Sequence, residues 1–321
     1  MQHDAAQEER FRRIFTAAHA HHHACAADEW LNEPCMDAPG HPSDRPLIWS
    51  RRNGPWRRVP ILWVGAAPGN AGGLGSSDMG AHGTRIPFGG DIAGGNLDVL
   101  LSTIGLDRNH TFLIAAYNQL PERGGGEPTT RELSAPVGRY PDSGALLRDT
   151  VIATGPELVI ALGNVGLRTL IAALTRPGDA PVGEPPRTAD RLRLPGPGRI
   201  AAAGIERGRV SSWPSAFPLA DGFRSAWRSA WGSEPSFDLL LVLHPSAQNM
   251  SPFARVTTQF HQRMLDTRAA ITAAARDVLR REPPSPRPAL PDTGIYAIPE
   301  WRSRVAERHA RYDALWREKG V

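Results

Sequence analysis

The sequence predicts an α/β fold of three layers, in which helices cover both faces of a central, mainly parallel sheet of four strands. Short apolar runs of strand length alternate along the 321-residue chain with longer segments of helical pattern. Each run stops at a small or chemically distinctive residue, as strands do where the carboxyl edge of a sheet carries a site. The predicted strands are 61–64, 111–116, 158–162 and 239–243.

The predicted helices lie before, between and after these strands. In chain order they are 4–31, 97–104, 143–154, 164–174, 255–281 and 299–319. Segments rich in proline and glycine or arginine, at 37–60 and 176–222, predict mainly irregular connections. We therefore divide the chain into a helical N-terminal extension with its linker (1–57), an α/β domain (58–266) and a helical C-terminal extension (267–321).

The composition predicts a soluble protein of the cytoplasm. Hydrophobic residues make up 40% of the chain, and no apolar run approaches the roughly 20 residues of a membrane span. No apolar signal segment opens the chain, and Cys25 and Cys35 are the only cysteines, so we expect a reducing compartment. Of 37 basic residues only Lys319 is a lysine; this arginine excess fits either a GC-rich genome or phosphate binding.

A glycine-rich turn follows the first predicted strand. It contains Gly65, Ala66, Ala67 and Pro68, and its small side chains would let backbone N–H groups approach a ligand closely. A tight turn ahead of a helix is the alternative. The spacing does not match a dinucleotide-binding fingerprint.

Two further motifs carry groups that could act in a reaction. Phe88, between proline and glycine, is suited to stack on a planar base, and Asp91 follows two glycines. Asp91 could equally cap the next helix. His244, directly after the last predicted strand and before Pro245, would project from the strand end, where an imidazole can stabilise a developing anion; a structural histidine is the alternative.

Together these motifs resemble the uracil-DNA glycosylase superfamily over about residues 58–266. The resemblance includes the Gly-Leu-Asp-Arg segment at 105–108 and the apolar strand with its glycine at 158–163. The type-b enzymes of family 5 are most similar, on the Gly-Asp at 90–91, the Ala-Ala at 115–116, the Pro-Thr-x-x-Glu at 128–132 and Asn249.

The resemblance implies an enzyme that flips a base out of DNA and hydrolyses its bond to the sugar. Phe88 would stack on the flipped base, His244 would hydrogen-bond the departing base, and Asp91 would orient water; Asp91 and His244 are the implied catalytic residues. The implied base pocket and DNA contacts involve further residues. The pocket comprises Gly65, Ala66, Ala67, Pro68, Phe88, Ala116 and Asn118, and the DNA contacts are Ser246, Gln248, Asn249 and Arg255.

The sequence departs from family 5 in its metal ligands. That family binds an iron–sulfur cluster through four cysteines, and the matching segment 118–126 has none, so we expect no cofactor. Histidines 19 and 21–23 near Cys25 could bind zinc, but a polar helix face explains them as well. We expect a monomer whose partner is DNA, double- or single-stranded, containing a deaminated or modified base.

Two alternatives stay open. The enzyme could excise a hypermodified cytosine from phage DNA, which would make it a defence enzyme. The fold could also serve as a catalytically inactive DNA-binding module.

Overall fold

The computed structural model describes the central sheet, the helices that flank it and much of the C-terminal region. The residues it describes are 9–10, 13–14, 17, 60–67, 92–108, 111–117, 121–122, 127–174, 237–242, 244–245, 258–284, 287–292, 296 and 299–318.

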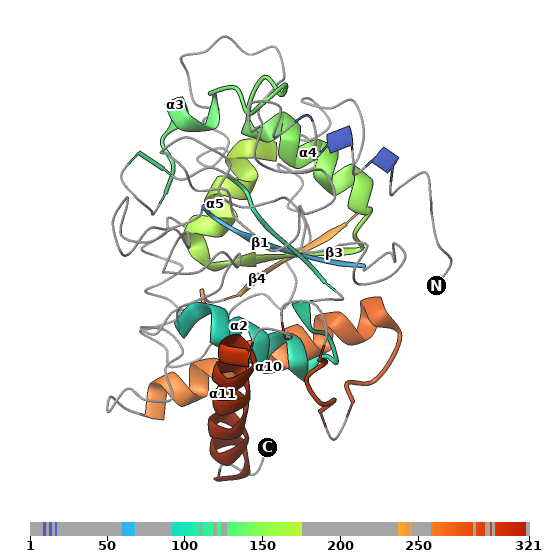
Figure 1. The fold of residues 1–321 in the computed structure, drawn as a ribbon, viewed down its shortest axis with the longest axis vertical. Helices are drawn as coiled ribbons and strands as arrows, with labels where there is room; N and C mark the ends of the chain where they lie inside the picture. The colour runs from blue at the N-terminus through green and yellow to red at the C-terminus, as the bar shows by residue number, and fades with distance from the viewer. Residues whose placement is uncertain are drawn as a thin grey trace.

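A sheet of four parallel strands lies at the centre of the molecule (Figure 1). Its strands stand in the order β2-β1-β3-β4. Their bounds are β1 Ile61–Gly65, β2 Phe112–Ala115, β3 Leu158–Leu162 and β4 Asp238–Val242. The pairing is parallel throughout, with Gly65 opposite Ala115 and Leu162 opposite Val242. The predicted three-layer α/β fold is confirmed.

Helices cover both faces of this sheet (Figure 1). On one face lie α4 (Ser143–Thr154) and α5 (Gly163–Leu174), and on the other α2 (Ile92–Thr103) and α10 (Thr258–Leu279). The final helix, α11 (Pro299–Glu318), packs against α2. The short helix α3 (Thr130–Leu133) precedes α4.

The core is split by the sheet because successive strand residues point to opposite faces. Leu62 and Val64 of β1 pack with α4 and α5, whereas Ile61 and Trp63 pack with α2, α10 and α11. All five residues of β1 are buried. This explains the continuous apolar runs that predicted the strands, since a strand covered on both faces needs no polar alternation.

Most predicted bounds agree with the structure to within one or two residues, and α4 agrees at both ends. The main difference is α2, which begins five residues earlier than predicted, at Ile92 rather than residue 97. Its first turns contain Gly94 and Gly95, which disfavour helix and so hid the start. A Cβ on Gly95 would lie 3.1 Å from Cγ of Arg308 in α11, so the close approach of two helices explains a glycine there.

The terminal extensions contribute to the core. Of the predicted helix 4–31, the described residues are helical, and Ile14 is buried with the α4–α5 face. The predicted boundary at 266/267 falls inside α10, which continues without a break. Tyr312 and Trp316 of α11 belong to the core on the α2 face. Among the described helices, none is both long and apolar enough to cross a membrane.

Candidate functional site

The candidate site lies at the carboxyl edge of the sheet, where the strand order changes direction. The chain leaves β1 for β2 at one edge and then returns past β1 to β3. The helix after β1, α2, covers one face, and the helix after β3, α5, covers the other (Figure 1). Connections that diverge in this way open a crevice beyond the strand ends, and ligands of α/β proteins bind in that crevice.

Small residues lie at and just after the ends of β1 and β2. The ladder continues past the strand ends, because the N–H of Ala116 donates to Gly65 O and that of Tyr117 donates to Ala66 O, both at 2.9 Å. Ala116 is buried, while Ala66 and Ala67 are half-buried. The structure therefore brings together three residues of the predicted base pocket, Gly65, Ala66 and Ala116.

His244 lies at the neighbouring strand ends. It follows β4 by two positions, its side chain is exposed, and Pro245 after it is buried. Gly163, the residue after β3, has φ +78°, and a Cβ built on it would lie only 2.7 Å from Cβ of His244. A side chain at position 163 would clash with the histidine, so the observed approach of His244 requires a glycine there.

The start of helix α5 packs against the end of β1. A Cβ on Gly166 in its first turn would approach Val64 O at 3.3 Å and Ala66 N at 3.6 Å. The missing side chain lets the start of α5 lie directly against the end of β1. The contacts at Gly163 and Gly166 thus group the ends of β1, β3 and β4 around one place.

Asn96 and Tyr312 also belong to this region, although sequence reasoning did not select either. Asn96 in α2 is completely buried, and its Nδ2 donates to Pro245 O at 2.8 Å. The hydroxyl of Tyr312 in α11 donates to Asn96 Oδ1 at 3.1 Å. No local sequence signal indicates these contacts, because the partners lie 149 and 216 residues apart.

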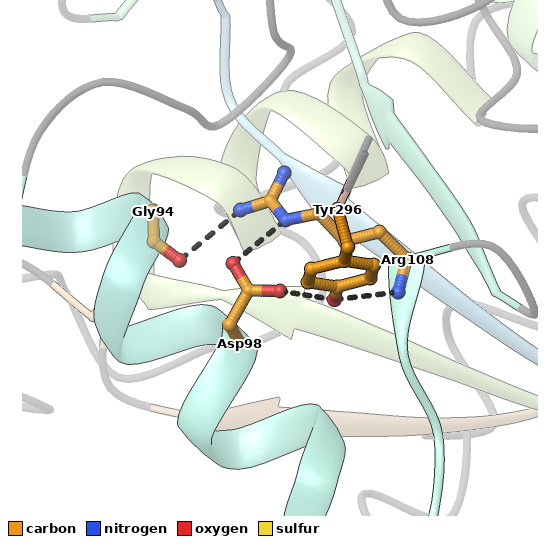
Figure 2. Close-up of polar contacts among 4 residues, drawn as sticks. All are labelled: Gly94, Asp98, Arg108 and Tyr296. Atoms are coloured by element: carbon orange, nitrogen blue, oxygen red, sulfur yellow. Dashed lines mark hydrogen bonds and ion pairs between the residues drawn. The ribbon is translucent and has the colours of Figure 1, made fainter. Parts of the chain in front are cut away.

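A second polar cluster joins α2 to the segment before α11, on the α2 face (Figure 2). Arg108 is completely buried; its Nε donates to Asp98 Oδ2 at 2.8 Å and its Nη2 to Gly94 O at 3.1 Å. Tyr296 donates to Asp98 Oδ1 at 2.6 Å and accepts from the N–H of Arg108 at 3.1 Å. Burial and the Asp98 carboxylate raise the pKa of Tyr296, so its hydroxyl stays a donor. This cluster stabilises α2 rather than presenting a group to a ligand.

Glu132 shapes the loop that follows β2. Thr129 and Glu132 form a capping box on α3, in which Glu132 N–H donates to Thr129 Oγ1 at 3.2 Å and Thr129 N–H donates to Glu132 Oε2 at 2.5 Å. The other carboxylate oxygen accepts from Glu122 N–H at 2.7 Å. Burial and the nearby carboxylates of Glu132 and Glu122 raise the pKa of Tyr117. The Pro-Thr-x-x-Glu motif therefore has a structural role: it caps α3 and bonds that helix to the backbone at Glu122.

The remaining predicted site residues lie outside the described part of the chain. They are Pro68, Phe88, Asp91, Asn118, Ser246, Gln248, Asn249 and Arg255. Helix α2 begins at Ile92, the residue after Asp91, so the helix-cap alternative for Asp91 stays open. The histidine cluster near Cys25 is also outside that part. Within it, no three His, Cys, Asp or Glu side chains are grouped as ligands for one metal ion.

Comparison with known proteins bears on the same segment. No curated protein sequence matches the chain. The model of the uracil DNA glycosylase superfamily matches residues 53–268, which include all four strands of the sheet and the site at its carboxyl edge. On that match and on the fold, the chain belongs to the uracil DNA glycosylase superfamily.

Proposed function

We propose that the protein is a monofunctional DNA glycosylase, which flips a deaminated or modified base out of DNA and leaves an abasic site. One observation carries this proposal: an exposed histidine lies against Gly163 at the same sheet edge as the small residues Gly65, Ala66 and Ala116. Membership of the superfamily supports DNA as the substrate.

The reaction needs a stabilised leaving base and a positioned water. Water attacks C1′ of the sugar as the bond from C1′ to the base nitrogen breaks, and the bonding electrons leave with the base. His244 donates a hydrogen bond to the base as it gains negative charge. We assign the water to Asp91, whose carboxylate accepts the proton and stabilises the positively charged sugar. A Schiff-base step is not part of the proposal, because the one lysine, Lys319, comes after α11.

The pocket residues favour a substrate range wider than uracil. Ala115 ends β2 and Ala116 follows it, and both side chains are small and cannot hydrogen-bond a base edge. A pocket bounded by alanine leaves room for a purine or a substituted pyrimidine. Phe88 would stack on whichever base enters, since every base offers an aromatic face.

DNA contacts are assigned to the segment after His244. Gln248 would fill the space that the flipped base leaves, with Ser246 and Asn249 beside it, and Arg255 would contact a phosphate. This segment follows Pro245, whose carbonyl is bound by Asn96. Pro245 therefore connects the proposed leaving-group residue with the proposed DNA contacts.

A panel of duplexes tests the proposal. Uracil, hypoxanthine, xanthine and modified cytosines are each offered in otherwise identical DNA, and the abasic product is revealed by alkali. We expect at least one base to be released, with the strand intact before alkali treatment. On that substrate His244→Ala should slow single-turnover cleavage on the order of 10²- to 10³-fold with little change in duplex affinity. A collapse of affinity with an unchanged rate for the bound complex would make His244 a DNA-binding residue instead.

A further inference from the structure

A continuous chain of hydrogen bonds connects the C-terminal helix with residues 244–245, which follow β4. Tyr312 of α11 donates to Asn96 Oδ1, and Asn96 Nδ2 of α2 donates to Pro245 O. Tyr312 is 1% exposed and Asn96 is 0% exposed. The Asn96 carboxamide thus spans the space between two elements and is oriented by a partner at each end. Water does not compete for these bonds, because both side chains are buried.

His244 and Pro245 are therefore contacted from two sides. On one side Gly163 lies so close that a Cβ there would be 2.7 Å from His244 Cβ. On the other side Asn96 binds the carbonyl of the next residue, Pro245. Proline restricts its own φ and also the conformation of the residue before it, which here is His244. The exposed His244 thus precedes a residue that α2 binds, and it lies against Gly163 at the junction of β3 and α5.

Helix α2 also leads to the second proposed catalytic residue. It begins at Ile92, directly after Asp91, and Asn96 lies about 6 Å further along its axis. One helix therefore follows Asp91 directly in the chain and, through Asn96, binds the residue after His244. Helix α11 packs along α2, and Gly95 brings the two helices close, with Arg308 against it.

We propose that Asn96 and Tyr312 are positioning residues for His244, and that the C-terminal helix is thereby a working part of the active site. They act through the Pro245 carbonyl and do not touch the substrate. This inference rests on the proposed function, because that function gives His244 a catalytic purpose. Substitutions should reduce the rate of base release while leaving duplex binding and the fold in place.

The kinetic test compares three variants under single-turnover conditions, at a temperature where each is fully folded. Asn96→Ala removes the donor to Pro245 O, and we expect a rate loss on the order of 10- to 100-fold, because small misplacements of a reacting group have effects of that size. Tyr312→Phe removes one oxygen and should give a smaller loss in the same direction. The Kd for the duplex should stay close to that of the wild type in both.

Tyr296→Phe is the matched control. Tyr296 is also 1% exposed, also lies in the C-terminal region, and its hydroxyl also contacts α2, but through Asp98 rather than Asn96 (Figure 2). Its loss should lower thermal stability without changing the rate of the folded enzyme. If Asn96→Ala fails to fold, Tyr312→Phe measured against Tyr296→Phe carries the comparison.

A second measurement is independent of activity. In protein with ¹⁵N-labelled histidine, the His244 signals are identified by their loss in His244→Gln. We expect these signals to move in Asn96→Ala and Tyr312→Phe and to stay unchanged in Tyr296→Phe. That pattern in a protein that cleaves none of the duplexes would support the positioning role of Asn96 and Tyr312 and reject the glycosylase proposal. Unchanged rates and unchanged His244 signals in both Asn96→Ala and Tyr312→Phe would overturn the inference, whatever the wild type cleaves.

Discussion

At the scale of single residues, the site depends on glycines at positions where a side chain would clash. Gly163 is the sharpest case, because its left-handed backbone and its contact with His244 both exclude a Cβ. Gly166 plays the same part for the start of α5 and the end of β1. These positions let strand ends and helix starts converge on one place, which larger side chains would separate.

Gly163→Ala should therefore reduce both stability and activity. The left-handed conformation alone costs about 1–2 kcal/mol for a residue with a Cβ. Gly155→Ala is the control, since Gly155 has φ +53° but caps α4 just before β3, at the opposite edge of the sheet. We expect similar losses of unfolding free energy in urea and a much slower single-turnover rate for Gly163→Ala alone. Equal rates for the two folded variants would show that Gly163 does not position His244.

Asp91→Asn tests the assignment of the water. The amide keeps the size of the side chain and its capping ability but cannot accept a proton, so the rate should fall roughly 10²-fold or more. Duplex affinity and the melting temperature should change little. Near-normal single-turnover cleavage by this variant would leave Asp91 as a helix cap and move the catalytic role elsewhere.

At the scale of the element, the Gly-Leu-x-Arg segment ends α2 and then stabilises it. Gly105, with φ +69°, donates to Ser102 O, and Leu106 donates to Leu101 O, which is the Schellman pattern. Three residues later Arg108 turns back and binds Asp98 and Gly94 of the same helix (Figure 2). Its guanidinium also lies 5.0 Å from the ring of Trp301, which is in α11.

Loss of Arg108 should be costly because it leaves a carboxylate buried without its cation. We expect Arg108→Ala to lower the unfolding free energy by about 3–5 kcal/mol, measured by urea denaturation. Replacing both partners, with Asp98→Leu and Arg108→Met together, should recover most of that loss. A loss below about 1 kcal/mol for Arg108→Ala would mean that Asp98 becomes protonated or hydrated at little expense.

At the scale of the whole molecule, the C-terminal region completes one layer of the fold. Tyr312, Leu315 and Trp316 pack with α2 and α10 in the core of that face. His309 is buried in the same helix, and desolvation, together with the positive charge of Arg287, lowers its pKa to about 4. A hydrogen bond with the Asp98 backbone and the charge of Asp313 oppose this shift without reversing it.

The buried histidine makes stability depend on pH. Between its ordinary pKa of 6.5 and about 4 in the fold, the unfolded chain binds a proton that the folded chain excludes. Stability is therefore lost as pH falls through this window, by roughly 3 kcal/mol in all. The urea unfolding free energy should fall less from pH 7 to pH 5 in His309→Gln than in the wild type. Identical changes in the two proteins would contradict a neutral, buried His309.

Sequence reasoning was most successful where the signal is local. The four strands could be placed because a strand buried on both faces is a short apolar run, and such runs need no distant partner to be recognised. Their ends brought Gly65, Ala116 and His244 to one sheet edge, because parallel strands all end on the same side. The predicted start of α2 was wrong by five residues, because Gly94 and Gly95 disfavour helix locally. In the fold, Arg108 binds the carbonyl of Gly94, and Gly95 lies against α11.

The sequence by itself determined the fold class, the superfamily resemblance and the candidate chemistry of Asp91 and His244. Only the tertiary structure decided what positions that chemistry: the contact of Gly163 with His244, and the bonds from Tyr312 to Asn96 and from Asn96 to the Pro245 carbonyl. The physical reason is the separation of the partners. The pattern of buried residues repeats over a few positions and can be recognised within a short segment. A hydrogen bond between residues 149 or 216 positions apart forms only once the chain has packed.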